Sequence, residues 1–189
     1  MLLVDSDYMY HSGNQMVDPY ILFKKAHMQP NMHVADFGCG QTGHIVFPCA
    51  RTLSDKGIVY AVDIMKDVLE QIDKRAKINS LLNLHTVWSD IEKVGHTSIP
   101  ARSLDIAFVV NTLVQADDRN AVLNEVHRLL KDKARLIIVD WVKKGLAFGP
   151  KDERFVNFSE IKKWALEHGY AVQEEFDMGR FHRGMVLYK

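Results

Sequence analysis

The residues best suited to chemistry are three glycines that follow a short apolar stretch. Gly38, Gly40 and Gly43 form the pattern G-x-G-x-x-G, directly after a predicted strand at 33–37. Glycine adopts backbone angles closed to other residues and lets a ligand approach the main chain without meeting a Cβ atom. A helix that begins after this turn directs its free N–H groups and the positive end of its dipole at that ligand. The pattern predicts a ligand-binding turn, although such turns are often only tight turns.

Two aspartates strengthen the case for a ligand. Asp36 lies two residues before Gly38, at the end of the first predicted strand. Asp63 follows a second predicted strand at 58–62 and lies 20 residues past Gly43, close to the spacing of the dinucleotide-binding pattern. A carboxylate at this point can accept hydrogen bonds from both hydroxyls of a ribose. The sequence therefore predicts an adenosine-type ligand across the carboxyl ends of two adjacent parallel strands.

The two motifs V-A-D-F-G-C-G and V-Y-A-V-D resemble those of the class I S-adenosylmethionine-dependent methyltransferases. The nearest likeness is to the small branch similar to the ubiquinone/menaquinone-biosynthesis (type 11) enzymes. The resemblance implies S-adenosylmethionine as cofactor and S-adenosylhomocysteine as product. It also implies that Asp36 lies near the ammonium end of the methionine part, that the turn containing Cys39 wraps this end, and that Asp63 binds the ribose.

The resemblance extends to the segment after the third predicted strand, Ser89-Asp90-Ile91. It implies that Asp90 binds the exocyclic amine of adenine, with Ile64 and Ile91 against the faces of the ring. A helix cap or turn is the alternative for Asp90, and core packing is the alternative for both isoleucines. Asn111 follows the fourth predicted strand and is expected beneath the cofactor. The predicted cofactor-binding residues are Asp36, Gly38, Cys39, Gly40, Asp63, Ile64, Ser89, Asp90, Ile91 and Asn111.

One departure from the family pattern leaves other functions open. The family usually reads G-x-G-x-G, whereas Thr42 stands here at the third glycine's place and Gly43 follows it. This is the dinucleotide spacing, so an NAD-dependent oxidoreductase is the first alternative. Asp36 favours the methyl donor, because a carboxylate is a poor neighbour for pyrophosphate. A non-catalytic protein that binds an adenosyl ligand is the second alternative.

No catalytic base can be named from the sequence. The Asp/Asn-Pro-Pro-aromatic tetrad of amino-nitrogen methyltransferases is absent, and the corresponding place reads V-V-N-T-L. We expect an in-line methyl transfer to a small molecule, which needs a base only if the acceptor must lose a proton. The histidines expected near the pocket are His11, His44 and His182. The loop 142–158 is a candidate substrate wall, and Tyr10, Trp141 and Phe148 are candidates for an apolar acceptor pocket or for the core.

Composition narrows the class of protein. Lys plus Arg and Asp plus Glu number 24 each in 189 residues, so the chain lacks the basic excess typical of nucleic-acid binders. No apolar run approaches the roughly 20 residues that a membrane span needs, and no metal-ligand cluster is visible. Cys39 and Cys49 are not expected to form a disulfide, which favours a cytoplasmic protein.

Strand and helix patterns alternate five times and then end in a hairpin, which predicts an open, mostly parallel α/β sheet with helices on both faces. The resemblance supplies a doubly wound, Rossmann-like three-layer sandwich whose seven strands follow the order 3-2-1-4-5-7-6, with the last strand antiparallel. Residues 1–17 are predicted to be a lid or a flexible segment, and 18–189 a single methyltransferase domain. Strands are predicted at 33–37, 58–62, 84–88, 104–110, 135–139, 170–176 and 184–188.

Helices are predicted between these strands. Asp18, Asp117 and Ser159 are expected to cap the first, fourth and fifth of them, and Pro48 is expected to bend the second. The Lys-Pro-Gly-Gly turn frequent in the family is replaced by Lys-Asp-Lys-Ala at 131–134, so this turn must be made differently. The predicted helices span 18–28, 44–53, 66–80, 118–130 and 159–168.

Overall fold

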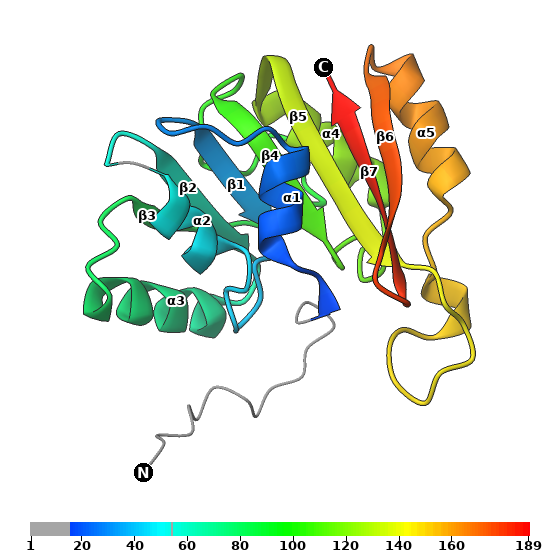
Figure 1. Cartoon of the computed structure of the whole chain (residues 1–189), viewed down its shortest axis with the longest axis horizontal. Coiled ribbons are helices and arrows are strands. Elements are labelled where there is room, and N and C mark those ends of the chain that lie inside the picture. The colour runs from blue at the N-terminus through cyan, green and yellow to red at the C-terminus, as the bar shows by residue number, and fades with distance from the viewer. Residues whose placement is uncertain (1–15, 54) are drawn as a thin grey trace.

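A computed structural model describes residues 16–53 and 55–189. Seven strands form one sheet in the order β3-β2-β1-β4-β5-β7-β6, and β7 pairs antiparallel with both β5 and β6, which confirms the predicted α/β fold (Figure 1). The predicted lid or flexible segment lies outside the described residues except for Met16 and Val17. The strands are β1 (His33–Phe37), β2 (Ile58–Asp63), β3 (Leu84–Trp88), β4 (Leu104–Val110), β5 (Leu130–Trp141), β6 (Ala171–Met178) and β7 (His182–Tyr188).

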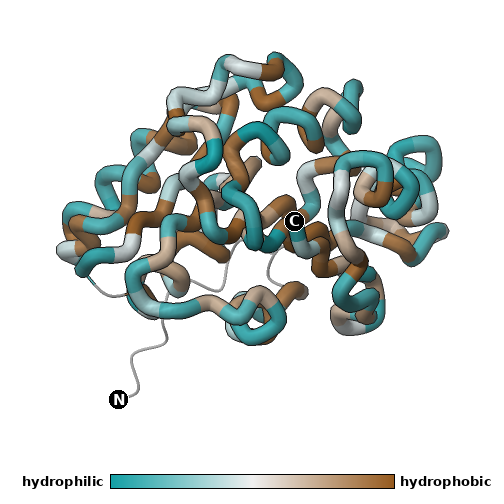
Figure 2. The backbone as a smooth tube through the Cα atoms, turned by 90° about the horizontal axis from the view of Figure 1, so that it is seen from above, coloured by the Kyte–Doolittle hydropathy of each residue, from teal (hydrophilic) through white to brown (hydrophobic). Residues whose placement is uncertain are grey.

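Helices cover both faces of this sheet. Because side chains alternate along a strand, Val34 contributes to a core shared with one set of helices, and Ala35 contributes to a core on the opposite face. Figure 1 shows α1 and α2 in front of the strands and α4 behind them, and Figure 2 shows hydrophobic segments running through the middle of the molecule. The helices of the first face are α1 (Pro19–Lys25), α2 (Val46–Thr52) and α3 (Lys66–Ile78), and those of the second are α4 (Arg119–Leu129) and α5 (Phe158–Glu167).

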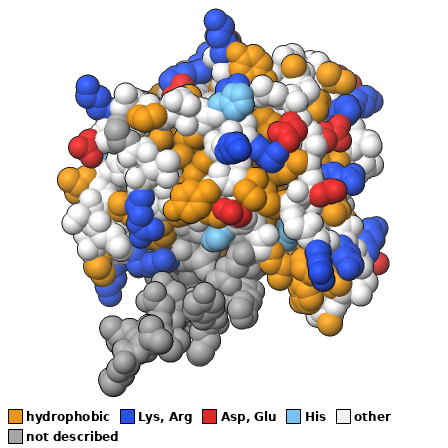
Figure 3. Space-filling view, viewed as in Figure 1, with side chains coloured by type: hydrophobic (Ala, Val, Ile, Leu, Met, Phe, Trp, Pro, Cys, Tyr) orange, Lys and Arg blue, Asp and Glu red, His pale blue; other side chains and the backbone are white. Residues whose placement is uncertain are grey.

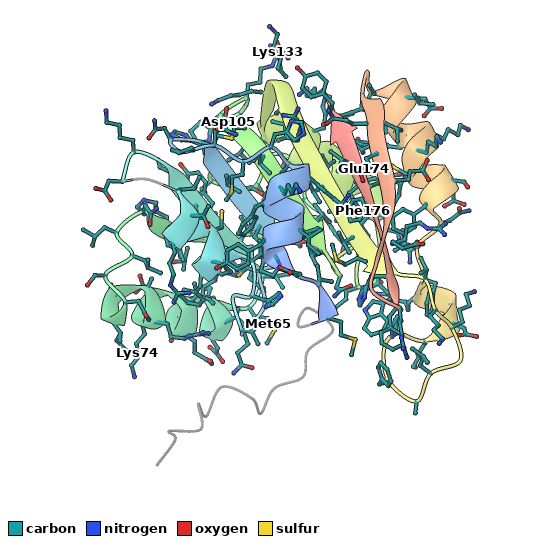
Figure 4. The ribbon with its side chains drawn as sticks, viewed as in Figure 1. Met65, Lys74, Asp105, Lys133, Glu174 and Phe176 are labelled. Carbon is teal, nitrogen blue, oxygen red and sulfur yellow. The ribbon has the colours of Figure 1, made fainter. Side chains whose placement is uncertain are left out.

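Strand register brings the predicted site residues to one edge of the sheet. Phe37 on β1 pairs with Val62 on β2 and with Val109 on β4, and Asp63 pairs with Trp88 on β3. The residues that follow these four parallel strands are therefore neighbours at the carboxyl edge. In Figure 4, Met65 marks this lower edge, whereas Asp105 and Lys133 lie at the opposite, upper edge.

Strand β5 begins earlier than predicted. It follows α4 directly at Leu130, and its pairing with β4 skips residues 131–134 opposite Asp105. Lys133 adopts a φ of +65° within this bulge, and its N–H donates to the carbonyl of Lys189. The Lys-Asp-Lys-Ala segment thus takes the place of the glycine turn by a bulge that the C-terminal residue closes.

Helix α2 corrects the prediction for Pro48. The helix begins at Val46 rather than at 44, so Pro48 occupies its first turn. Backbone N–H groups in a first turn have no partner inside the helix, and a proline there removes no hydrogen bond. The predicted bend has no cause at this position.

Helix α1 ends at Lys25 through a Schellman-type closure, in which His27 has a φ of +50° and the Met28 N–H donates to the Phe23 carbonyl.

The caps of two helices differ from the predicted residues. Asp118 rather than Asp117 caps α4, and its carboxylate accepts from the Ala121 N–H at 2.9 Å. Asn157 rather than Ser159 caps α5, because its side chain accepts from the Ser159 N–H at 3.0 Å. Asp117 and Asp118, like Asn157 and Ser159, are both residue types that cap helices well, so the sequence alone does not identify which member of each pair forms the cap. Asp18 caps α1 as predicted, accepting from the Tyr20 N–H.

No helix in the described part of the chain is long and apolar enough to cross a membrane.

Candidate functional site

A cavity of about 490 Å³ opens at the carboxyl edge of the sheet, between α3 and the segment that follows β4. It extends from the glycine turn across the ends of β2 and β3 to the end of β4. Eight of the ten predicted site residues line it, which brings together motifs from four different strands. They are Gly38, Gly40, Asp63, Ile64, Ser89, Asp90, Ile91 and Asn111.

The three glycines serve three different purposes. All have positive φ, but a Cβ atom on Gly38 would meet the Thr112 side chain at 2.7 Å, whereas one on Gly43 would meet Phe47 and Ile72 at 2.6 Å. Apart from the two chain neighbours of Gly40, no atom of the described residues lies within 4 Å of a Cβ built on it. Gly43 therefore allows α2 and α3 to pack closely on the turn, the same packing role that the third glycine has in the dinucleotide-binding pattern. Gly40 alone keeps the backbone open towards the cavity.

Asp63 joins the ends of β1 and β2. Its carboxylate accepts from the N–H of Gly40 and from the N–H of Met65, each at 3.0 Å, and the thiol of Cys39 lies 3.9 Å from Oδ2. The two backbone donors fix the carboxylate at the cavity wall. An ionised carboxylate offers about four acceptor positions, so with the two N–H groups and the thiol as donors at least one remains for a hydroxyl group of a ligand.

Asp36 lies beneath the glycine turn rather than on the cavity surface. The side chain is 3% exposed, and no described residue donates a hydrogen bond to its carboxylate. Burial, and then the nearby charge of Asp63, raise the pKa of Asp36 to about 8. A buried carboxyl costs stability when it ionises, so a positively charged group placed beside Asp36 would favour its ionised form.

Cys39 has a structural position inside the same turn. Its side chain is fully buried and does not line the cavity, and burial together with Asp36 and Asp63 raises the pKa of its thiol. A thiol held in this form is a poor nucleophile. Cys49 is likewise buried and free, so neither cysteine forms a disulfide.

The far end of the cavity is formed by residues around the end of β3. The Ser89 hydroxyl lies 2.9 Å from that of Thr97, and Asp90 forms an ion pair with Lys93 at 2.9 Å. The hydrogen bond from Lys93, together with the Glu92 N–H, lowers the pKa of Asp90 and keeps it ionised. The Ile64 side chain is 56% exposed and lies against the cavity, where a flat ring could cover it.

Sequence reasoning missed the wall formed after β4. Thr112 donates a hydrogen bond to the Phe37 carbonyl at 2.7 Å, and the Val114 N–H donates to the buried carboxylate of Asp140 at 3.1 Å. These bonds hold the segment that carries Gln115 and Ala116 against the cavity. No motif marks this segment, although its place after a central parallel strand could have pointed to it. Thr112 is expected with Asn111 beneath the cofactor, and the missed lining residues are Gln41, Met65, Val68, Glu92, Gln115, Ala116 and Val122.

The histidines considered as bases have different surroundings. The Nε2 atom of His44 lies 2.6 Å from the Val17 carbonyl, which ties the end of the N-terminal segment to the start of α2. His182 is buried beside Trp141, with 4.4 Å between ring centroids, and burial lowers its pKa to about 4. His11 and Tyr10 lie outside the described residues. None of these described histidines lines the cavity.

Comparison with protein families gives one match. A family model described as "Methyltransferase domain" matches residues 28–179, which includes the glycine turn, the cavity and most of the sheet. No curated protein matches this sequence.

Groups of three or more His, Cys, Asp or Glu that could hold a metal ion are not found among residues 16–53 and 55–189.

Solved structures share the fold at low sequence identity. A SAM-dependent methyltransferase from Aquifex aeolicus superposes with a TM-score of 0.82 at 23% identity, covering 95% of this chain and 93% of that one. A protein described as a type 11 methyltransferase from Sulfolobus solfataricus gives 0.70 at 24% identity, covering 91% and 92%. The [4+2]-cyclase SpnF gives 0.71 at 14% identity, covering 87% and 60%. These likenesses concern the fold.

Proposed function

The chain belongs to the methyltransferase-domain family, and from this premise we propose that it transfers a methyl group from S-adenosylmethionine to a small molecule. One observation supports the proposal most strongly. The cavity of about 490 Å³ runs from an open glycine turn, past one acid at the end of β2, to another after β3. This sequence of groups matches the succession of charged, hydroxylated and aromatic parts in the proposed cofactor.

The residues present fit such a cofactor. Gly40 leaves room for the main chain of a ligand, and the buried carboxylate of Asp36 below it suits an ammonium group. Asp63, fixed by two backbone donors, retains at least one acceptor position for a ribose hydroxyl. At the far end, Ile64 and Ile91 offer apolar faces to adenine, and Asp90 offers an acceptor to its amine.

When bound, S-adenosylmethionine supplies a methyl group on a positively charged sulfur, which is already an electrophile. The task of the protein is then to align an acceptor and to exclude water, and such positioning can contribute roughly 7–11 kcal/mol to catalysis. Asn111 and Thr112, at the end of the central strand β4, are the cavity residues that we propose to lie nearest the acceptor. No described group is assigned as a general base.

Two alternatives receive less support. An NAD-dependent oxidoreductase would place pyrophosphate above the buried Asp36, a carboxyl that supplies no positive charge to a phosphate group. The packing role of Gly43 is common to both kinds of site, so the glycine spacing does not separate the two cofactors. A non-catalytic protein that binds the same nucleoside would use the same cavity, so binding alone does not distinguish it. Neither the fold nor the family match favours either alternative.

A calorimetric titration tests the cofactor. We expect S-adenosylhomocysteine to bind, and NAD and NADP not to bind, under the same conditions. Tight binding of NAD without binding of the sulfur nucleoside would reverse the proposal. Activity is tested by incubating the protein with methyl-labelled donor and a cell extract, where we expect label in a small-molecule product. Binding without any transferred label would favour the non-catalytic alternative.

We further propose that the protein acts in the cytoplasm. Cys39 and Cys49 are both free and buried, which suits a reducing compartment.

A further inference from the structure

A cluster of aromatic rings lies at the carboxyl edge beyond the cofactor cavity. Trp141 at the end of β5 contacts His182 at the start of β7, with ring centroids 4.4 Å apart, and contacts Phe181 and Phe148 at 6.3 and 6.1 Å. Phe148 and Phe181 are 5.5 Å apart. We call Trp141, Phe148, Phe181 and His182 the aromatic cluster. It joins the loop after β5 to the β6–β7 hairpin.

His182 is the unusual member of this cluster. It is 1% exposed, and neither ring nitrogen has a hydrogen-bond partner among residues 16–53 and 55–189. Burial keeps the imidazole neutral by lowering its pKa to about 4, so one nitrogen can accept and the other can donate. A buried polar atom without a partner lowers the stability of a folded protein, because it gives up its hydrogen bonds to water. An apolar ring would pack here at lower cost, which points to a partner that arrives with a ligand.

Register places His182 within reach of the cofactor cavity. Trp141 pairs with His182 across β5 and β7, and the Asn111 N–H donates to the Val139 carbonyl of β5 at 2.8 Å. His182 is therefore two strand spacings from the last cavity residue on β4, or roughly 10 Å. A flat molecule of two fused rings spans such a distance.

The loop after β5 borders the aromatic cluster on its solvent side. Phe148 is 49% exposed, and Phe181 is partly exposed as well. Phe148 lies between Gly145 and Gly149, which both have positive φ, and Gly149 packs against the Trp141 ring. Figure 3 shows hydrophobic and basic side chains together at the lower right, where Figure 1 draws this loop.

We propose that the aromatic cluster holds the methyl acceptor, a flat apolar molecule that presents one O–H or N–H group to the imidazole of His182. This inference rests on the proposed function, because it assigns the acceptor subsite of the same enzyme. His182 binds and orients the acceptor, Trp141 covers its ring, and Phe148 moves aside for entry. The apolar character comes from the rings, and the selectivity for a hydrogen-bond donor comes from the unpartnered nitrogen.

Two probes of matched shape test the inference: 2-naphthol, which has a donor, and 2-methylnaphthalene, which has none. Their binding to the full chain saturated with S-adenosylhomocysteine is measured by calorimetry. We expect the wild type to prefer 2-naphthol about tenfold, the scale of one hydrogen bond. His182→Phe keeps a ring against Trp141 but removes both nitrogens, so this preference is expected to vanish while the affinity for 2-methylnaphthalene stays. Its thermal midpoint should be unchanged or higher, whereas a structural histidine would lower it.

His127→Phe provides the matched control. His127 also has a pKa lowered to about 4 by burial, but its Nδ1 lies 3.1 Å from the Tyr170 hydroxyl, so it has a partner. We expect this variant to keep the preference for 2-naphthol. Equal binding of both probes to the wild type, a preference that survives in His182→Phe, or no binding of either probe overturns the inference. Failure of S-adenosylhomocysteine to bind overturns the proposed function instead, so the two failures are distinguishable.

Discussion

Asp36→Asn provides the sharpest test of the site, because stability and binding should change in opposite directions. The carboxyl has a pKa of about 8 in the folded chain, against an ordinary value of 3.8. Between these values the folded chain keeps one proton that the unfolded chain releases, so the stability of the wild type falls as pH rises. The slope is about 1.4 kcal/mol per pH unit, or roughly 2.7 kcal/mol between pH 5 and 7.

The Asp36→Asn variant has no carboxyl that titrates at this position. Between pH 5 and 7 its free energy of unfolding should therefore increase by roughly 2.7 kcal/mol relative to that of the wild type. Urea unfolding of both proteins at each pH measures it. Asp177→Asn controls for loss of one negative charge, because the Asp177 side chain is 75% exposed. Parallel stability profiles for wild type and Asp36→Asn would refute the assignment of a protonated acid beneath the glycine turn.

Binding should change the other way. A cationic ligand favours the ionised form of Asp36, so S-adenosylmethionine should displace about one proton from the wild type at pH 7. Calorimetry in buffers of different ionisation enthalpy counts that proton. Asp36→Asn should bind more weakly and release none, which also corrects for titration of the ligand itself. Proton release that is equal in the two proteins would contradict a contact between Asp36 and the cationic end of the cofactor.

Three further changes test other parts of the site and its support. Gly40→Ala and the control Gly169→Ala each place a Cβ in open space at positive φ, so both should lose about 1 kcal/mol of stability. Only Gly40→Ala should weaken the binding of S-adenosylhomocysteine, by at least about tenfold in calorimetry. Asp63→Ala should weaken the same binding by about 1–3 kcal/mol, and unchanged binding would show that the ribose lies elsewhere. Burial opposes the ionisation of Glu125, yet Arg128 and backbone donors lower its pKa to about 2. The ionised Glu125 therefore stabilises the fold fully above pH 4.5, and this contribution is lost as the pH falls towards 2. Glu125→Gln should cost about 2–3 kcal/mol at pH 7 in urea unfolding and little at pH 2.

Much of the fold could be predicted because its signals are local. Buried parallel strands read as apolar runs, and the predicted bounds of β1, β3 and β4 agree with the structure. The start of β5 could not be predicted, because the segment 131–134 is polar and joins the strand only through a bulge closed by Lys189. Asp118 rather than Asp117 caps α4, and Asp117 instead pairs with Arg154, a distant residue that no local pattern indicates.

The site divides in the same way. Gly38, Gly40 and Asp63 could be predicted because a tight turn next to a ligand restricts the residue type. Gln115 and Ala116 could not, because this wall is held by backbone bonds to distant groups such as the Asp140 carboxylate. Any small or polar side chain serves there, so the sequence carries no distinctive pattern. The role of Gly43 also needed the structure, since only the packing of Phe47 separates it from a ligand contact.

The treatment of buried polar groups distinguishes structural positions from functional ones in this chain. Glu125 accepts from the N–H groups of Gly95 and Thr97 and pairs with Arg128, and Asp140 accepts from two backbone donors. The fold thus satisfies buried acids where they only hold loops. Asp36 and His182 receive no such bonds from the described residues, and both occupy the carboxyl edge. Within the described part of the chain, ionising Asp36 or leaving the His182 nitrogens unpaired lowers stability, and the proposed ligands would offset this cost: a cation for Asp36 and a hydrogen-bond donor for His182.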